Sequence, residues 1–175
     1  MTRLITISLI GLLTSNPNYN IIYNNTQKAK NEITYRKLQW VDFKPSGKRG
    51  NIAALSNTGI VYETTIFKNN IDIEISCIFD VNVSFVVSGN MNDRILSHEQ
   101  KHFDITYIYS IKFRDRLRNE SSLDEKKISD IYNQIIKEWN ECQDRYDLET
   151  NHSNSQENQD LWNNKLNIEL NKITK

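Results

Sequence analysis

Hydrophobic and polar residues alternate along one stretch in the first half of the chain. The apolar residues at every second position are Ile71, Ile73, Ile75, Cys77 and Phe79. A period of two is typical of a β-strand that buries one face. Residues 53–67 are also rich in β-branched and aromatic side chains, and Asn69-Asn70 predicts a turn between two strands. This half of the chain is therefore expected to form a sheet.

The second half shows the period of α-helices instead. Residues 92–119 contain no Pro or Gly, and their apolar residues fall on two sides of the expected helix, which indicates burial between two layers. Ser122 with Glu125, and Ser153 with Gln156, form capping-box patterns that predict the starts of two more helices. Strands followed by helices predict an α+β fold, with an N-terminal antiparallel or mixed β-sheet and then three helices.

The first residues have the composition of a signal peptide. Arg3 precedes an apolar run of ten residues, and Ser15 stands where cleavage could follow. Ten apolar residues are too few to cross a bilayer, so no stable membrane span is expected. We expect residues 1–15 to be a signal peptide and the protein to be exported to the periplasm, the cell envelope or the outside. A buried N-terminal strand is the alternative. Residues 16–31 are polar and are expected to be a flexible lead-in to a single domain at 32–175.

Charge and length narrow the class of protein further. The 22 Lys and Arg residues balance the 22 Asp and Glu residues, so neither nucleic acid nor an anionic membrane surface is expected as a partner. A chain of 175 residues can bury one core without disulfides. Cys77 and Cys142 are the only cysteines, which speaks against a cysteine-based metal site. They form either one disulfide or two buried free thiols.

One motif in the long helical segment carries chemistry. His98 and His102 are four residues apart, so both imidazoles project from one face of a helix and can share a metal ion. Glu99 lies about 100° around the helix from His98, so it flanks the metal rather than binding it. Zinc lowers the pKa of a coordinated water to about 7, and a flanking carboxylate can accept the proton as general base. A solvated polar turn is the alternative, but the apolar neighbours Leu96 and Phe103 disfavour it. The pattern predicts a zincin-like active-site helix that binds one zinc ion per chain.

A catalytic zinc of this kind needs a third protein ligand and one open position. The metzincin pattern would continue with glycine and histidine where Ile105 and Ile108 stand, so that class is excluded. Asp115 and Glu120 belong to the same expected helix as His102 and cannot fold back onto it.

His152 is the remaining histidine, and the expected loop between the second and third helices would let it reach the first helix. We expect His152 to be the third zinc ligand. The alternative is a solvent-exposed loop histidine, with Asp147 and Glu149 as fallback ligands.

Further side chains are expected to support the chemistry. Asp104 lies about 200° around the helix from His102, so we expect it to form a cap or salt bridge behind the site. It could also accept a hydrogen bond from a ligand imidazole. A side chain that stabilises an oxyanion is expected as well, and the sequence does not choose among the candidates Tyr62, Tyr109 and Tyr146.

Several segments of the chain resemble a known family. The segments are 38–44, 53–54, 58–60, 79–80, 84–86, 96–105, 146–152 and 159–162. They resemble a group of mostly exported bacterial proteins that are described as zinc-dependent proteases because of the helix motif. The resemblance covers about residues 38 to 170. Phe85 stands where tryptophan is usual in the family, and Ser153 stands where glycine is usual.

The resemblance implies export, zinc at His98 and His102, a catalytic Glu99 and His152 as the third matching histidine. It implies no particular substrate. The first hypothesis is thus an exported zinc metallopeptidase whose peptide or protein substrate pairs with an edge strand of the sheet. The second is a non-catalytic zinc-binding protein of the cell envelope. The third is an α+β interaction module that binds no zinc.

Overall fold

The computed structural model describes residues 18–23, 32–67 and 70–173. The expected signal peptide, residues 1–15, lies outside the described residues. The strands are β1 (Asn18–Tyr23), β2 (Glu32–Thr34), β3 (Lys44–Ser46), β4 (Ala54–Leu55), β5 (Thr58–Phe67), β6 (Asn70–Asp80) and β7 (Phe85–Val87). The helices are the short 3-10 helix η1 (Trp40–Asp42), α1 (Asp93–Arg118), α2 (Glu125–Thr150) and α3 (Gln156–Ile173).

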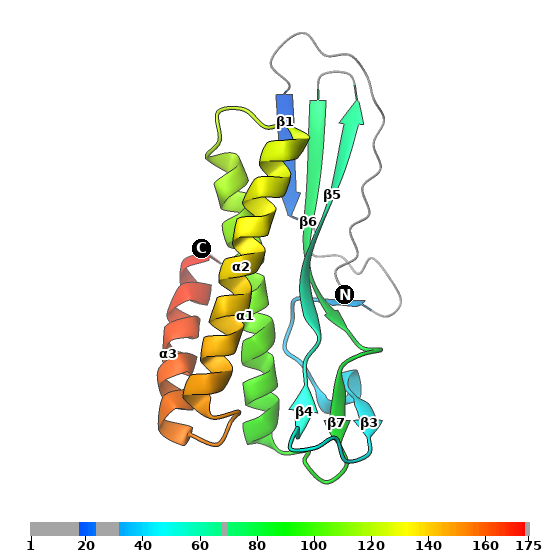
Figure 1. The fold of residues 1–175 in the computed structure, drawn as a ribbon, viewed down its shortest axis with the longest axis vertical. Helices are drawn as coiled ribbons and strands as arrows, with labels where there is room; N and C mark the ends of the chain where they lie inside the picture. Colours follow the sequence, from blue (N-terminus) through cyan, green and yellow to red (C-terminus); the bar gives the residue numbers. More distant parts are fainter. Residues whose placement is uncertain (1–17, 24–31, 68–69, 174–175) are drawn as a thin grey trace.

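Strand β6 is the centre of a four-stranded sheet. β5 pairs with it antiparallel, in a register that runs from Thr58 opposite Phe79 to Phe67 opposite Asn70. β1 pairs with β6 in parallel and β2 pairs with it antiparallel. A second sheet has three strands in the order β3-β7-β4 and lies beside the end of α1 where that helix begins (Figure 1).

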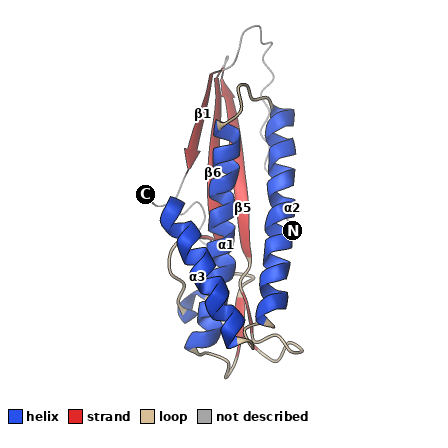
Figure 2. Ribbon diagram, turned by 90° about the vertical axis from the view of Figure 1, so that its left-hand side faces the viewer, coloured by secondary structure: helices blue, strands red, loops and turns tan. Residues whose placement is uncertain are grey.

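Helix α1 lies between the strands and helix α3, and helix α2 packs beside α1 and, through its first half, against the large sheet (Figures 1 and 2). This position explains why its apolar residues fall on two sides. Toward the sheet, Phe113 and Leu117 pack in one cluster with Ile60 and Ile73. Toward the helices, Ile105 belongs to a cluster that α2 and α3 complete. The expected α+β order of strands and then three helices is confirmed.

The structure differs from the sequence prediction at three boundaries. Residues 18–23 form strand β1, although they fall within the expected flexible lead-in, because the edge of β6 offers them backbone partners. Helix α2 is capped by Asp124, whose side chain accepts a hydrogen bond from the Lys127 backbone, so the expected box at Ser122 is wrong. Ser153 does not cap α3 either, because its φ of 71° places it within a left-handed turn.

The core predicts a large stability difference between two leucines. Leu117 is 0% exposed, whereas Leu148 on α2 is 79% exposed. We expect Leu117→Ala to lower the free energy of unfolding by about 2–5 kcal/mol, because it leaves a cavity between the sheet and α1. Leu148→Ala should change it by less than about 0.5 kcal/mol. Urea denaturation of both variants measures the two values, and equal losses would contradict this assignment of the core.

The two cysteines are free and buried, and they lie in separate hydrophobic clusters. Of the two alternatives that the sequence left open, the structure contains the pair of buried thiols. None of the described helices is long and apolar enough to cross a membrane.

Candidate metal centre

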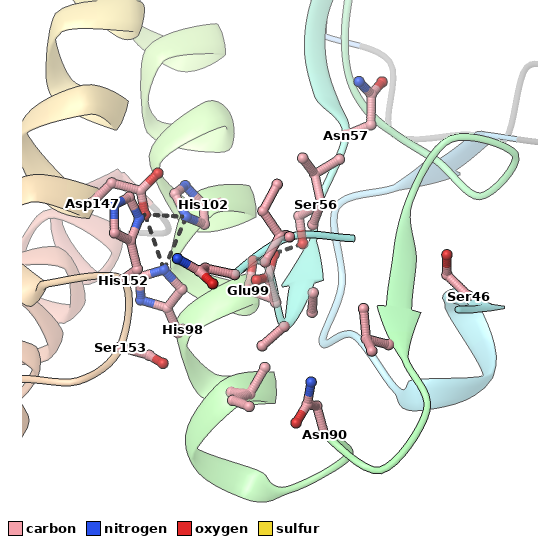
Figure 3. A pocket seen from close by; sticks show the side chains of 18 of the residues that line it. Ser46, Ser56, Asn57, Asn90, His98, Glu99, His102, Asp147, His152 and Ser153 are labelled. Atoms are coloured by element: carbon pink, nitrogen blue, oxygen red, sulfur yellow. Dashed lines mark hydrogen bonds and ion pairs between the residues drawn. The ribbon is translucent and has the colours of Figure 1, made fainter. Parts of the chain in front are cut away.

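Helix α1 presents the two histidines of the motif toward one point. Asn92 caps the helix by accepting a hydrogen bond from the Ile95 backbone, so the next turn carries His98 and the turn after it carries His102. Their rings meet edge to face, and their Nε2 atoms lie 3.2 Å apart (Figure 3). The four-residue spacing therefore brings both imidazoles together, as the sequence predicted.

Helix α2 supplies the third group. Asp147 lies in its last turn, and Asp147 Oδ1 is 3.1 Å from Nε2 of His98 and 3.1 Å from Nε2 of His102. One ligand atom from each of these three residues lies within 4.8 Å of the others, the arrangement needed to hold a metal ion. The sequence predicts His152 as the third ligand and Asp147 only as a fallback.

His152 lies beside this group rather than within it. Its side chain is 74% exposed, and its Nδ1 is 3.5 Å from Asp147 Oδ1. Helix α2 continues to Thr150, so Asp147 is held on the helical face toward α1 while His152 falls beyond the end of the helix. The turn after the helix has three successive left-handed residues, with φ of 49° at Asn151, 50° at His152 and 71° at Ser153.

Two other candidates bind partners away from the metal group. Asp104 accepts hydrogen bonds from Lys101 Nζ at 2.7 Å and from Tyr35 at 3.0 Å. It thus forms the salt bridge expected behind the site and makes no contact with the histidines. Glu149 accepts a hydrogen bond of 2.7 Å from Trp162 Nε1, and its backbone carbonyl accepts one from Asn158. Glu149 is therefore not placed to act as a ligand.

None of the three tyrosine candidates lines the pocket that contains the two histidines. Tyr62 packs against Phe113 and Tyr132 in the core beside the large sheet. Tyr109 lies farther along α1, over the cluster formed with α2 and α3. Tyr146 does reach the site, but its ring stacks on His98 with centroids 4.7 Å apart and its hydroxyl donates to the His98 carbonyl. Tyr146 thus supports an imidazole and is not directed at a substrate.

Two glutamines that the sequence analysis did not consider contact the other nitrogens of the histidines. Gln143 Oε1 is 2.7 Å from His102 Nδ1, and Gln159 Oε1 is 3.1 Å from His98 Nδ1. The sequence contains one indication of Gln143. It lies four residues before Asp147, so both residues occupy the same face of α2. No comparable spacing identifies Gln159, which comes from α3.

The charge of the site suits a cation. Burial raises the pKa of Asp147, but hydrogen bonds from His102 and His98 outweigh it and hold that pKa well below its usual range. Burial also lowers the pKa of His102, yet the hydrogen bond to Asp147 and the nearby Glu99 carboxylate leave it raised. A carboxylate that stays ionised between two imidazoles is a donor set that zinc favours.

The Glu99 carboxylate is buried, and one of its oxygens has no hydrogen-bond partner in the described part of the chain. The residue is 4% exposed, and its buried Oε2 accepts no hydrogen bond from any residue that the structure describes. A buried unpaired carboxylate oxygen is costly unless something else binds there. Glu99 lines the same pocket as His98 and His102 and lies next to them in Figure 3. The residues present therefore fit a metal ion with an adjacent base.

The pocket that contains these groups has a volume of about 1220 Å³. One wall is formed by α1 and the end of α2, and the opposite wall by β4 with the segments on either side of it. Ser56, just after β4, donates a hydrogen bond to the Glu99 carbonyl of α1 and so links the two walls.

Residues 88–153 match the model of a bacterial protein family of unknown function (DUF922). The matched stretch contains the motif on α1, Asp147 and His152, and it ends before Gln159. The family's description assigns no activity and no metal. No curated protein and no solved structure matches the chain.

Proposed function

We propose that this protein is an exported zinc-dependent peptidase that binds one zinc ion through His98, His102 and Asp147 and uses Glu99 as its general base. The observation that carries the proposal is the buried Glu99 carboxylate, whose Oε2 has no hydrogen-bond partner among the described residues, beside three converging metal-ligand atoms. A site that only held a metal would have no use for this carboxylate. Export rests on the signal-peptide composition of residues 1–15.

The roles of the residues follow from their positions. A zinc ion bound here would acidify a water molecule and polarise the scissile carbonyl. Glu99 lines the pocket and its Oε2 has no hydrogen-bond partner among the described residues, so the carboxylate can accept the water proton and donate it to the leaving amine. His98 and His102 stay fixed during these steps, because Tyr146 stacks on one ring and contacts the other edge to face.

Strand β4 supports a peptide as the substrate. It lies at the end of the order β3-β7-β4 and also lines the pocket. The Ala53 carbonyl accepts a hydrogen bond from the Val87 backbone, and successive residues of a strand direct their backbone groups to opposite sides. The backbone groups of Ala54 therefore face away from β7. An extended peptide that added to this edge would lie in the pocket opposite Glu99.

The proposal predicts peptide cleavage that depends on zinc. The purified chain is incubated with a peptide library after treatment with a chelator and again after zinc is restored. We expect cleavage to disappear with the chelator and to return with zinc, because the histidines and Asp147 alone cannot activate water. A Glu99→Gln preparation made in parallel identifies contaminating peptidases. Cleavage that the chelator leaves unchanged, or that this variant retains, would contradict the proposal.

A further inference from the structure

The orientation of both imidazoles is set by amide groups that come from two different helices. Gln143 of α2 contacts His102 Nδ1, and Gln159 of α3 contacts His98 Nδ1, in each case through Oε1. An amide oxygen can only accept a hydrogen bond, so each ring must carry its proton on Nδ1. Which end of each amide faces the ring therefore decides the chemistry of the site.

The orientation of the Gln143 amide is determined by its other hydrogen bonds. Its Nε2 donates to the His102 carbonyl at 2.9 Å and to Thr106 Oγ1 at 3.1 Å. A carbonyl oxygen accepts only, so the nitrogen of the amide must lie on that side. Oε1 is thereby turned toward His102 Nδ1, and a flipped amide would lose the bond to the carbonyl.

Gln159 is held by side-chain hydrogen bonds alone, and it is 2% exposed. Its Nε2 donates to Asn163 Oδ1 at 3.0 Å and to the Tyr146 hydroxyl at 2.8 Å. The Tyr146 hydroxyl in turn donates to the His98 carbonyl. Oε1 faces His98 Nδ1 at 3.1 Å and also lies 3.1 Å from the Tyr146 hydroxyl, which can donate to it.

We propose that Gln143 and Gln159 are positioning residues that fix both histidines as the Nδ1–H tautomer, so that both Nε2 lone pairs face Asp147 Oδ1. Three electron-rich atoms then lie within about 3.2 Å of one another. They repel one another unless a proton, as in the hydrogen bonds to Asp147 described above, or a metal ion lies between them, so the two amides prepare the site for a metal ion. The inference rests on the proposed metal centre and adds to it a role for α3, which lies outside the stretch that matches the family model.

The groups that accept the Nδ1 protons, the amides of Gln143 and Gln159, are neutral, and this affects how strongly a bound metal would acidify water. A carboxylate acceptor makes a ligand imidazole more basic and strengthens its bond to the metal. Amide acceptors fix the tautomer without adding negative charge, so a bound metal keeps more of its power to acidify water. A glutamate at either position would make the imidazole more basic but would lose the hydrogen bonds that Nε2 donates to the His102 carbonyl or to Asn163 Oδ1.

The first test is metal affinity, measured by competition with a chelator on the full chain. Gln143→Leu and Gln159→Leu keep the side-chain volume and remove the acceptor, and each is expected to weaken zinc binding about 10–100-fold. Gln134→Leu, at an exposed position of α2, is the matched control and should have no effect. Gln143→Glu keeps an acceptor for His102 Nδ1 but loses the hydrogen bond to the His102 carbonyl, so it should bind zinc more tightly than Gln143→Leu. A merely structural glutamine would not be rescued in this way.

The second test observes the tautomer directly, in the zinc-loaded parent protein, so it does not depend on how the variants fold. Nitrogen-15 NMR of labelled histidines should show coordination through Nε2 and a slowly exchanging Nδ1–H on both rings. Coordination through Nδ1, or leucine variants that bind zinc as tightly as the parent, would overturn the inference. If the parent binds no zinc at all, the proposed function fails instead, so the two failures are distinguishable.

Discussion

Asp147→Ala is expected to weaken zinc binding by more than about 100-fold, since even the hydrogen-bond partners of metal ligands typically contribute 10–100-fold. The carboxylate is equidistant from both histidines, at 3.1 Å from each Nε2. Its removal leaves two imidazoles, which are too few for a site of the zincin type. Zinc affinity by chelator competition measures the effect, and the thermal unfolding temperature of the metal-free variant shows whether the fold survives.

His152→Ala is the matched comparison, because the sequence favoured His152 as the third ligand. Its side chain is 74% exposed and touches the metal group only through a 3.5 Å contact with Asp147. We expect this variant to lose less than about tenfold in affinity, because the contact is exposed to solvent. If His152→Ala loses zinc and Asp147→Ala retains it, the third ligand is His152 and the loop must close onto the site.

Glu99→Gln is expected to abolish hydrolysis while the protein still holds one zinc ion. A positioned general base contributes about 10²–10⁴-fold to the rate, and the amide cannot accept the proton. The carboxylate is not placed as a ligand, so zinc content should stay the same. Peptide cleavage and zinc content are measured on the same preparation.

Glu157→Gln, at an exposed position of α3, is the control for loss of a carboxylate and should change neither property. Cleavage at the parent rate in Glu99→Gln would exclude Glu99 as the base. Loss of zinc in that variant would instead make Glu99 a ligand, contrary to the geometry of the site.

The sequence was sufficient where a short-range pattern determines the structure. The period of two in β6 and the two-sided apolar pattern of α1 predicted the order of strands and helices. The spacing of His98 and His102 on one helix predicted that their rings meet. These features depend on residues within a turn or a strand of one another, so no knowledge of the tertiary fold was needed.

The third metal ligand depends on where α2 ends, and this the sequence did not show. Asp147, Glu149 and His152 lie close together along the chain, so which of them faces α1 depends on how far the helix continues. Helix α2 extends to Thr150, which directs Asp147 at α1 and Glu149 at Trp162. The capping box expected at Ser122 gave no help, because it concerns the opposite end of the helix.

Gln159 shows a second kind of limit. Its contact with His98 joins residues 61 positions apart and exists only because α3 packs against both other helices. Glutamine has no sequence pattern that marks it as a partner of a metal ligand. Strand β1 is similar, since its pairing with β6 depends on an edge that forms only in the folded sheet.

The measurement that tests the central claim most directly is the metal content of the purified full chain after exposure to zinc and removal of the excess. Elemental analysis reports zinc per chain, with a His98→Ala, His102→Ala double variant as the reference. The account predicts about one zinc ion in the parent protein and none in the double variant. A parent protein that contains no zinc, or a double variant that contains as much as the parent, would contradict it.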